Sequence, residues 1–419
     1  MRKLTVKNFS VIKEAELEFG KITVLIGPQS SGKSLLCKLV FFFSQVIPEI
    51  DYSTLVFYKS LDAFRILLLH EFNERFPKDT WIGQAFQIAY KSTQFDVTVE
   101  YVGASAHPSF EFNSEFPKRY GKPVQISSVP TGKMNAIDSR WIDERIVDGP
   151  LRQEHSVYIP TGRAFFSTPN RGFASFSGKN LDWITQRFST EIDFSYRNLI
   201  ESSDTDNHLL IDFWKQAARI LGGAVVDMGG LPYFKHFESN RELPFELQSS
   251  GTLELLPLLN PLGNRVAHAK YPKIPTAQLP QFGTIFVEEP ESSVFPKTQY
   301  ELVRLFTWLA NEPALNNSLA ITTHSPYILT AFNTLIEAWR VGNKQGKRKQ
   351  VAALIPEKYW VNENDFAAYA IHDGVLTSIF SNEKEGKEGS GLIDGDYLDS
   401  VSDQLGGQFD KLLDIEYAN

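Results

Sequence analysis

The sequence predicts an α/β fold, because segments with strand and helix patterns alternate along the chain. Residues 21–26, KITVLI, read as an apolar strand that is followed at once by a glycine-containing loop and a helical pattern. Two more apolar strand-like runs, at 284–289 and 318–324, flank a helix-like stretch at 297–311. No heptad pattern is sustained along the chain, so a long coiled coil is not expected.

The first part of the chain is expected to be rich in strands. Besides 21–26, alternating polar and apolar residues predict strands at 2–8, 14–19, 84–90 and 95–103. Residues 35–46 contain no Gly or Pro and predict a buried helix that ends before Pro48. A second helix is expected within residues 53–72.

The middle of the chain carries helical patterns at 181–188 and 208–221, which predict a compact helical insertion. The segment 260–283 is dense in Pro and Gly and predicts a long irregular loop. The expected organisation is residues 1–160 and 241–340 as the two parts of one α/β unit, 161–240 as the insertion, and 341–419 as a C-terminal segment.

Composition and charge exclude several classes of protein. The 419 residues are 42% hydrophobic and 22% charged, as in an ordinary globular protein. The formal net charge of −8 disfavours coating of nucleic acid by bulk charge. The single cysteine, Cys37, cannot form an intrachain disulfide. No apolar run reaches the about 18–20 residues of a membrane span, and no signal-peptide core follows Met1, so we expect a cytoplasmic protein without a membrane partner.

The most specific motif is Gly27–Ser34, GPQSSGKS, which fits the G-x-x-x-x-G-K-[ST] phosphate loop. In such a loop the backbone N–H groups surround phosphates, the lysine reaches the β and γ phosphates, and the final hydroxyl binds Mg²⁺. The alternative is a surface turn, but the loop lies between a strand and a helix, as the motif requires. The expected nucleotide-binding residues are Gly27, Gln29, Ser30, Ser31, Gly32, Lys33, Ser34 and Leu35.

A second motif is the apolar strand 285–287 followed by Glu288 and Glu289. In phosphoryl transfer, a carboxylate at a strand end holds Mg²⁺ and a neighbouring one orients the attacking water. Glu288 fits the metal role together with Ser34, and Glu289 fits the role of the base. The alternative is a solvated strand end.

Two weaker motifs complete the set. Ser249, Ser250 and Gly251 precede a leucine-rich stretch and predict an anion site at a helix N-terminus, although the same residues also suit an ordinary helix cap. His324 ends the strand at 318–324 and can form a hydrogen bond with a γ-phosphate, although a lone histidine also suits a structural role.

In chain order, these four motifs resemble the Walker A, signature, Walker B and switch-histidine series of ABC-type ATPases. The opening LTVKNFSVIKEAELEF at 4–19, EEPE at 288–291 and THSPYIL at 323–329 resemble the RecF, SMC and OLD-like branch of that superfamily. The resemblance implies an ATPase head with a mixed sheet, ATP and Mg²⁺ as ligands, and Lys33, Glu289 and His324 as the residues that act on ATP.

The resemblance also implies how two copies assemble. Ser249 and Gly251 would close over the γ-phosphate of ATP held by the partner subunit, which gives a head-to-tail homodimer or a higher multiple of dimers. Two departures imply slow turnover: Glu288 stands where many ABC ATPases have Asp, and the signature lacks the Gly-Gly pair. Arg163 lies in a string similar to an IPxxR motif of defence-associated members, either as a sensor of nucleotide or partner or as a surface arginine.

A nuclease domain, which OLD enzymes carry, is not expected. Asp394, Gly395 and Asp396 lack a preceding apolar strand and better suit a helix cap. The chain is similar to the AriA subunits of PARIS anti-phage defence systems, which implies a sensor or scaffold that controls a separately encoded effector such as a nuclease.

Several alternatives stay open. One is a RecF-like clamp on duplex DNA, with a basic cluster as its candidate contact; the cluster comprises Arg340, Lys344, Lys347, Arg348 and Lys349. Another is a scaffold that binds ATP without hydrolysing it, and a transporter motor is a third. Gln84, Gln87 and Gln94 are the candidates for the Q-loop glutamine of ABC ATPases.

Overall fold

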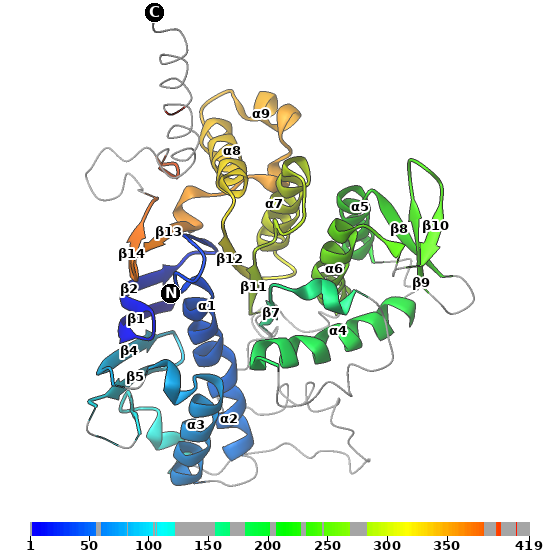
Figure 1. The fold of residues 1–419 in the computed structure, drawn as a ribbon. Coiled ribbons are helices and arrows are strands. Elements are labelled where there is room, and N and C mark those ends of the chain that lie inside the picture. The colour runs from blue at the N-terminus through cyan, green and yellow to red at the C-terminus, as the bar shows by residue number, and fades with distance from the viewer. Residues whose placement is uncertain are drawn as a thin grey trace, which may run out of the picture.

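The computed structural model describes residues 2–55, 60–81, 83–103, 105, 107–121, 156–167, 181–201, 207–227, 232–244, 247–268, 283–380, 391–394 and 408. Its main feature is an eleven-stranded sheet in the order β6-β5-β4-β1-β2-β14-β13-β3-β12-β11-β7 (Figure 1). The sheet contains both parallel and antiparallel pairs and carries helices, so the predicted α/β class with a mixed sheet is confirmed.

One half of the sheet is antiparallel. It comprises β1 (Arg2–Phe9), β2 (Ile12–Phe19), β4 (Phe86–Lys91), β5 (Asp96–Tyr101) and β6 (Ser109–Phe112). In β5 buried and partly exposed side chains alternate, which is the period-2 pattern from which the sequence predicts these strands.

The other half is parallel and holds the predicted motifs. It comprises β3 (Ile22–Ile26), β12 (Ser318–Thr323), β11 (Thr284–Glu288) and β7 (Val157–Ile159). Every residue of β3 and β11 is buried, as expected for central strands of a parallel sheet. Because these strands run in the same direction, the loops after β3, β11, β12 and β7 all lie at one edge of the sheet.

Four strands of this sheet were not predicted, namely β6, β7 and two strands near the middle of the sheet. β13 (Phe366–His372) pairs in parallel with β3, and β14 (Val375–Ser378) joins it to β2. They lie between β2 of the antiparallel half and β3 of the parallel half, although β2 and β3 are consecutive in sequence. The C-terminal segment therefore supplies part of the central sheet.

The helical path after the glycine loop continues past Pro48, so the predicted helix end was wrong. α1 (Lys33–Phe41) passes through a π-helical turn, Phe42–Val46, into α2 (Ile47–Ser53). Pro48 lies in the first turn of α2, directly after the π-helical turn, where the hydrogen-bond pattern of the helix changes. α3 (Leu61–Arg75) follows and begins at a Ser60 cap.

The predicted irregular loop at 260–283 was also wrong in its first part, because α6 (Ser250–His268) extends through Pro257 and Pro261. A Cβ at Gly263 would lie 2.7 Å from the ring of Trp214, so the glycine allows α5 (His208–Leu221) to pack closely against α6. Burial of this face overrides the local preference of Pro and Gly for a loop. Residues 269–282 lie outside the described part.

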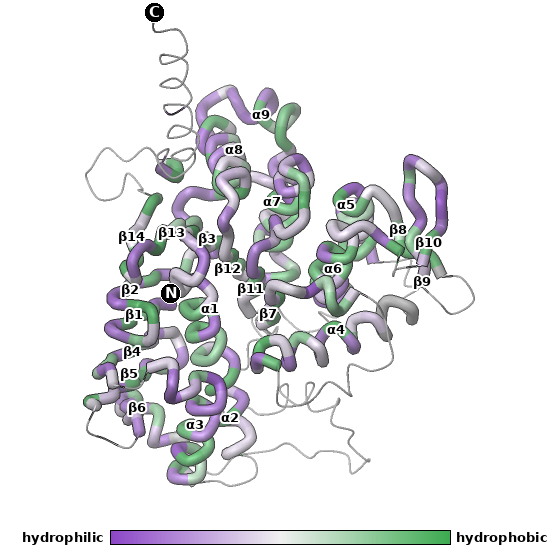
Figure 2. The backbone as a smooth tube through the Cα atoms, viewed as in Figure 1, coloured by the Kyte–Doolittle hydropathy of each residue, from purple (hydrophilic) through white to green (hydrophobic). Residues whose placement is uncertain are grey.

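The segment predicted as a helical insertion, 161–240, contains more than helices. α4 (Trp183–Glu201) and α5 are followed by a three-stranded antiparallel sheet, in which β8 (Gly223–Asp227) and β10 (Glu242–Pro244) flank β9 (Pro232–His236). Figure 2 shows that the β9–β10 hairpin is largely hydrophilic. The boundaries of the insertion remain a prediction.

The remaining helices are α7 (Pro296–Asn311), α8 (Pro326–Gly342) and α9 (Arg348–Leu354). Buried apolar side chains form two clusters: one joins the parallel strands to α4–α8, and the other joins the antiparallel strands to α1–α3. The longest helices of the described part have 19 residues, and none there is long and apolar enough to cross a membrane.

Candidate active site

The loop between β3 and α1 has the backbone shape of a phosphate cradle. Gly32, directly before α1, has φ of 104°, and a Cβ there would lie 2.3 Å from the Ile12 side chain. A Cβ at Gly27 would lie 2.4 Å from the carbonyl oxygen of Ile371 on β13. Only glycine fits either position. Both glycines thus let the backbone pass close to its neighbours as it enters the N-terminus of α1, where backbone N–H groups can bind an anion.

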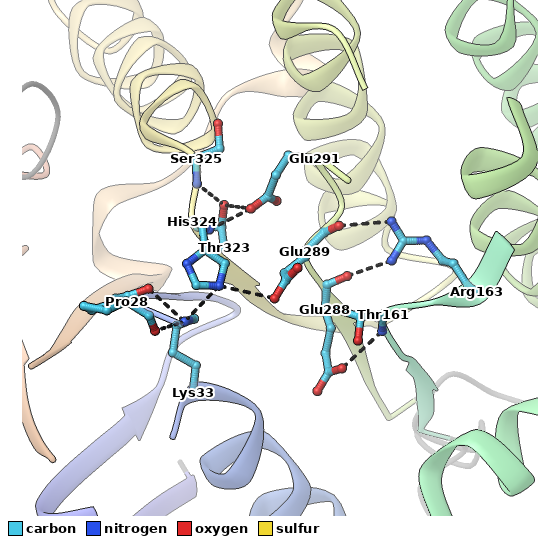
Figure 3. A network of polar contacts seen from close by, with 11 residues as sticks. Pro28, Lys33, Thr161, Arg163, Glu288, Glu289, Glu291, Thr323, His324 and Ser325 are labelled. Carbon is cyan, nitrogen blue, oxygen red and sulfur yellow. Dashed lines mark hydrogen bonds and ion pairs between the residues drawn. The ribbon is translucent and has the colours of Figure 1, made fainter. Parts of the chain in front are cut away.

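Lys33 is buried at the centre of this loop. Its Nζ donates hydrogen bonds to the carbonyl oxygens of Gly27 and Pro28, both at 2.8 Å (Figure 3). Burial lowers the pKa of the Lys33 amine, and the nearby carboxylates, Glu289 first, oppose this shift. The amine thus has neutral partners that phosphate oxygens could replace.

Glu288 lies at the end of β11 and is 5% exposed. Its Oε1 accepts a hydrogen bond from the Tyr158 hydroxyl at 2.6 Å, and its Oε2 accepts one from the Thr161 backbone N–H at 3.2 Å. Burial, together with the Glu288 charge, raises the pKa of Tyr158 well above its usual value, so the phenol stays a donor. The carboxylate is therefore held in one orientation.

Glu288 lies near the backbone of Ser34, and these are the two residues predicted to hold Mg²⁺. The Tyr158 hydroxyl, bound to Glu288, also lies 3.4 Å from the Ser34 carbonyl oxygen, so Glu288 and Ser34 are close neighbours. Among the described residues, no group of three or more His, Cys, Asp and Glu side chains is arranged to hold a metal. Magnesium in nucleotide sites is typically held by one or two protein oxygens, phosphates and water, which matches this sparse donor set.

Three residues from three loops meet beside the cradle (Figure 3). The Nε2 atom of His324 lies 3.2 Å from Glu289 Oε1 and 3.3 Å from Lys33 Nζ. The predicted base, histidine and loop lysine thus form one polar cluster. Glu289 itself has φ of 42°, in the left-handed region that non-glycine residues rarely adopt.

Glu291 fixes the backbone of the histidine loop. Its Oε1 accepts hydrogen bonds from the Thr323 hydroxyl at 2.8 Å and from the His324 N–H at 2.6 Å. Ser325 then caps α8 by accepting from the Tyr327 N–H. The acidic string after β11 therefore positions His324 as well as presenting Glu289.

A cavity of ≈ 330 Å³ opens over the loop. Its lining includes Gln29 to Leu35, Glu289 and His324, as well as Ser10, Val11, Lys38, Arg75, Phe76, Pro77, Thr80, Asp182 and Trp183. The Arg75 guanidinium lies 5.2 Å from the centre of the Trp183 ring, and Lys38 pairs with Asp182 at 3.1 Å. The sequence analysis missed this wall, because its residues come from α1, α3 and the start of α4 without a common motif.

Ser249, Ser250 and Gly251 are not among the residues that line this cavity. Ser249 and Ser250 are exposed, and the Ser249 hydroxyl accepts from the Thr252 N–H at the start of α6. A Cβ at Gly251 would lie 2.9 Å from the Ser293 carbonyl, so the segment packs against the loop after β11. The three residues therefore do not take part in the cavity over their own chain's glycine loop.

Arg163 is fully buried, so the interpretation as a surface arginine was wrong. Its guanidinium donates to the carbonyl oxygens of Pro160, Glu288 and Glu289 and to that of Glu254 on α6, at 2.8 to 3.2 Å. Burial lowers the pKa of Arg163, and Glu254 is the first of the carboxylates that oppose the shift. These bonds aim the guanidinium at the backbone and away from the cavity.

The other candidate residues lie elsewhere. None of Gln84, Gln87 and Gln94 lines the cavity over the loop; Gln87 binds Glu100 on the neighbouring strand. In the basic cluster, Arg340 pairs with Glu337 and Glu363, and Arg348 pairs with Glu357. Asp394 donates its N–H to the Ile379 carbonyl, whereas Gly395 and Asp396 lie outside the described residues.

The sequence was compared with known families and structures. Residues 200–330 match a family model described as "AAA domain, putative AbiEii toxin, Type IV TA system". This range includes Ser249–Gly251, Glu288, Glu289 and His324. It does not include the glycine loop, because the match begins at residue 200 and the loop lies at 27–34. No curated protein matches the sequence.

Solved structures with a similar arrangement were also found. An SMC head domain from Thermotoga maritima is 11% identical, with a TM-score of 0.38, and the alignment covers 91% of this chain and 98% of that one. An SMC head domain from Pyrococcus furiosus, bound to the C-terminal domain of ScpA, is 11% identical with a TM-score of 0.41, and the alignment covers 92% of this chain and 98% of that one. A dimeric bacterial ABC transporter cassette is 10% identical with a TM-score of 0.30, and the alignment covers 90% of this chain and 100% of that one. The chain has a glycine loop with the G-x-x-x-x-G-K-S pattern, and the structure brings its Lys33 together with Glu289 and His324 at one cavity. Its residues 200–330 resemble a family of AAA domains.

Proposed function

We propose that the protein binds and slowly hydrolyses ATP and that ATP joins two copies head to tail. The observation that carries this proposal is the convergence of Lys33, Glu289 and His324 at one cavity, whose lining does not include the Ser249–Gly251 segment of the same chain. A site without its own signature segment is complete only when a second copy supplies one.

The residues would divide the chemistry as follows. The loop N–H groups and Lys33 bind the phosphates and neutralise their charge as it develops. Glu289 orients water for attack on the γ-phosphorus, and His324 contacts both Glu289 and the transferred phosphate. Ser34 and Glu288 would hold Mg²⁺, which supplies further charge neutralisation when bound. Hydrolysis then separates the two copies.

We further propose that the assembly cycle controls a separately encoded effector, such as a nuclease, in anti-phage defence. The match of residues 200–330 to a family described with a toxin–antitoxin system supports this direction. A DNA clamp is less well supported, because two arginines of the basic cluster, Arg340 and Arg348, are engaged in ion pairs with carboxylates of the same chain.

The assembly is tested by adding a charge where the partner's phosphate would lie. Ser250→Asp places a carboxylate in the first turn of α6, where the helix dipole favours it, so the fold should be retained. We expect light scattering to show that wild type doubles in mass with ATP and Mg²⁺, whereas Ser250→Asp stays monomeric. Ser250→Asn, its neutral isostere, should still assemble. Assembly of all three proteins alike would contradict the proposed interface.

The cavity wall predicts where the base binds. Trp183 lies on the wall formed by α3 and α4, so we place the adenine ring against it, and stacking on an aromatic side chain is worth about 1–3 kcal/mol per base. We expect Trp183→Leu, which keeps an apolar side chain, to weaken ATP binding about tenfold or more in calorimetry. Inorganic tripolyphosphate, which lacks the base, should bind both proteins equally. An equal loss for the two ligands would mean that Trp183 acts through the fold alone.

A further inference from the structure

Arg163 connects two functional segments of the chain that are far apart in sequence. It begins a 3-10 turn, Arg163–Phe166, directly after β7. One edge of its guanidinium holds the end of β11: Nη1 donates to the Glu288 carbonyl at 2.8 Å, and Nη2 donates to the Glu289 carbonyl at 3.0 Å. Both carboxylate-bearing residues of the site are thus fixed through their backbone.

The other side of Arg163 holds the first turns of α6. Its Nε donates to the Glu254 carbonyl at 3.2 Å and lies 3.4 Å from the Glu254 carboxylate. Glu254 is four residues, about one helical turn, after Ser250. Because a guanidinium is planar and rigid, a shift of one edge moves the other. Figure 3 shows Arg163 reaching toward Glu288 and Glu289 from the far side of β11.

The segment that Arg163 holds is under backbone strain. Glu289, at φ of 42°, is kept there by its N–H, which donates to the Thr322 carbonyl at 2.8 Å, and by Arg163 on its own carbonyl. A non-glycine residue in this region is strained and persists only where its surroundings enforce it. The Glu289 side chain contacts His324, which contacts Lys33. Occupation of the loop by phosphate can therefore act on the strained Glu289 through Lys33 and His324.

We infer that Arg163 is a positioning residue that transmits the state of the phosphate loop to the Ser249–Gly251 segment of the same chain. The inference rests on the proposed function, because in the head-to-tail dimer that segment faces the partner's nucleotide. ATP binding at one site then adjusts the segment that completes the other site. Arg163 couples the two sites without touching either nucleotide.

Hydrogen exchange in a chain that cannot close on a partner tests this coupling. In the Ser250→Asp background, ATP with Mg²⁺ should slow amide exchange in the loop and α1, residues 27–41, and also change it in residues 251–256. Couplings between sites are commonly about 5- to 150-fold, so we expect at least a fivefold change in the second segment. A lysine at position 163 cannot contact both the end of β11 and α6. Adding Arg163→Lys should therefore remove the response of residues 251–256 and keep the response of residues 27–41.

A milder variant and a control keep the test decisive. Glu254→Gln removes only the ion pair with Arg163. It should weaken the exchange response of residues 251–256 at least about twofold, and it gives a test that does not depend on whether Arg163→Lys folds. Glu301→Gln removes the unrelated Arg304 pair on α7 and should change neither response. If ATP changes exchange in the loop of Ser250→Asp but not in residues 251–256, the inference about Arg163 is wrong. It is also wrong if the change in residues 251–256 survives both Arg163→Lys and Glu254→Gln, and neither outcome contradicts the proposed function. No response in the loop overturns the proposed function and the inference with it.

Discussion

Glu289→Gln should reduce phosphate release by about 10²–10⁴-fold, the range typical for loss of a positioned general base. Its Oε1 lies 3.2 Å from His324 Nε2 on the open side of the site, so the carboxylate can reach a water beside the γ-phosphate. Glutamine has nearly the same shape but cannot accept the proton. ATP binding and ATP-dependent assembly should therefore persist, and light scattering should find the variant locked as a dimer. Phosphate release is measured in parallel on the same samples.

Glu291→Gln, which makes the same change two residues after Glu289, is the matched control. The Glu291 Oε1 accepts hydrogen bonds from the Thr323 hydroxyl and from the His324 backbone N–H. A glutamine Oε1 can accept the same two bonds. Glu291→Gln should therefore keep phosphate release within about tenfold of wild type. If Glu291→Gln is as inactive as Glu289→Gln, the acidic string acts as a structural unit and Glu289 has no special role as base.

Lys33→Met should weaken ATP binding by at least about 10²-fold. Hydrogen bonds that involve a charged group are worth about 1.5–3 kcal/mol each, and the Lys33 amine is placed to form two with phosphate oxygens in exchange for the Gly27 and Pro28 carbonyls. Because burial lowers the pKa of Lys33, loss of the charge relieves a desolvation cost in the nucleotide-free protein. We therefore expect circular dichroism to show a folded variant, and calorimetry to show the loss of binding.

Lys38→Met separates this effect from a general loss of positive charge. Lys38 is on the same helix and lines the same cavity, but Asp182 neutralises its ammonium at 3.1 Å. We expect less than a tenfold loss of affinity, in line with the small contribution of exposed ion pairs. Comparable losses for the two lysines would mean that the net charge of the cavity, and not the loop geometry, dominates binding.

The sequence by itself determined the parts of the site whose residues are adjacent in the chain. The Gly27–Ser34 loop, the Glu288–Glu289 strand end and His324 each follow a short apolar run, because a strand pattern and its terminal loop are local properties. The mixed α/β class follows from the same patterns. Parallel strands end at one edge, so the convergence of these loops could be expected before any contact was known.

Only the tertiary structure decided which residues surround those motifs. β13 enters the sheet beside β3 from more than 300 residues away, and its Ile371 carbonyl is the reason that Gly27 cannot carry a side chain. Tyr158 and Thr161 hold Glu288, and Trp183 walls the cavity, through contacts that no local pattern encodes.

Arg163 shows this division most clearly. In the sequence it is one arginine among many, open to interpretation as a sensor or a surface residue. Folding buries it completely, and a buried guanidinium must find acceptors for its N–H groups. The acceptors are backbone carbonyls of β11 and α6, which sequence patterns do not distinguish from any others. The motifs of the candidate site were therefore set by local sequence, and the connection of Glu288 and Glu289 to α6 through Arg163 was set by burial and long-range packing.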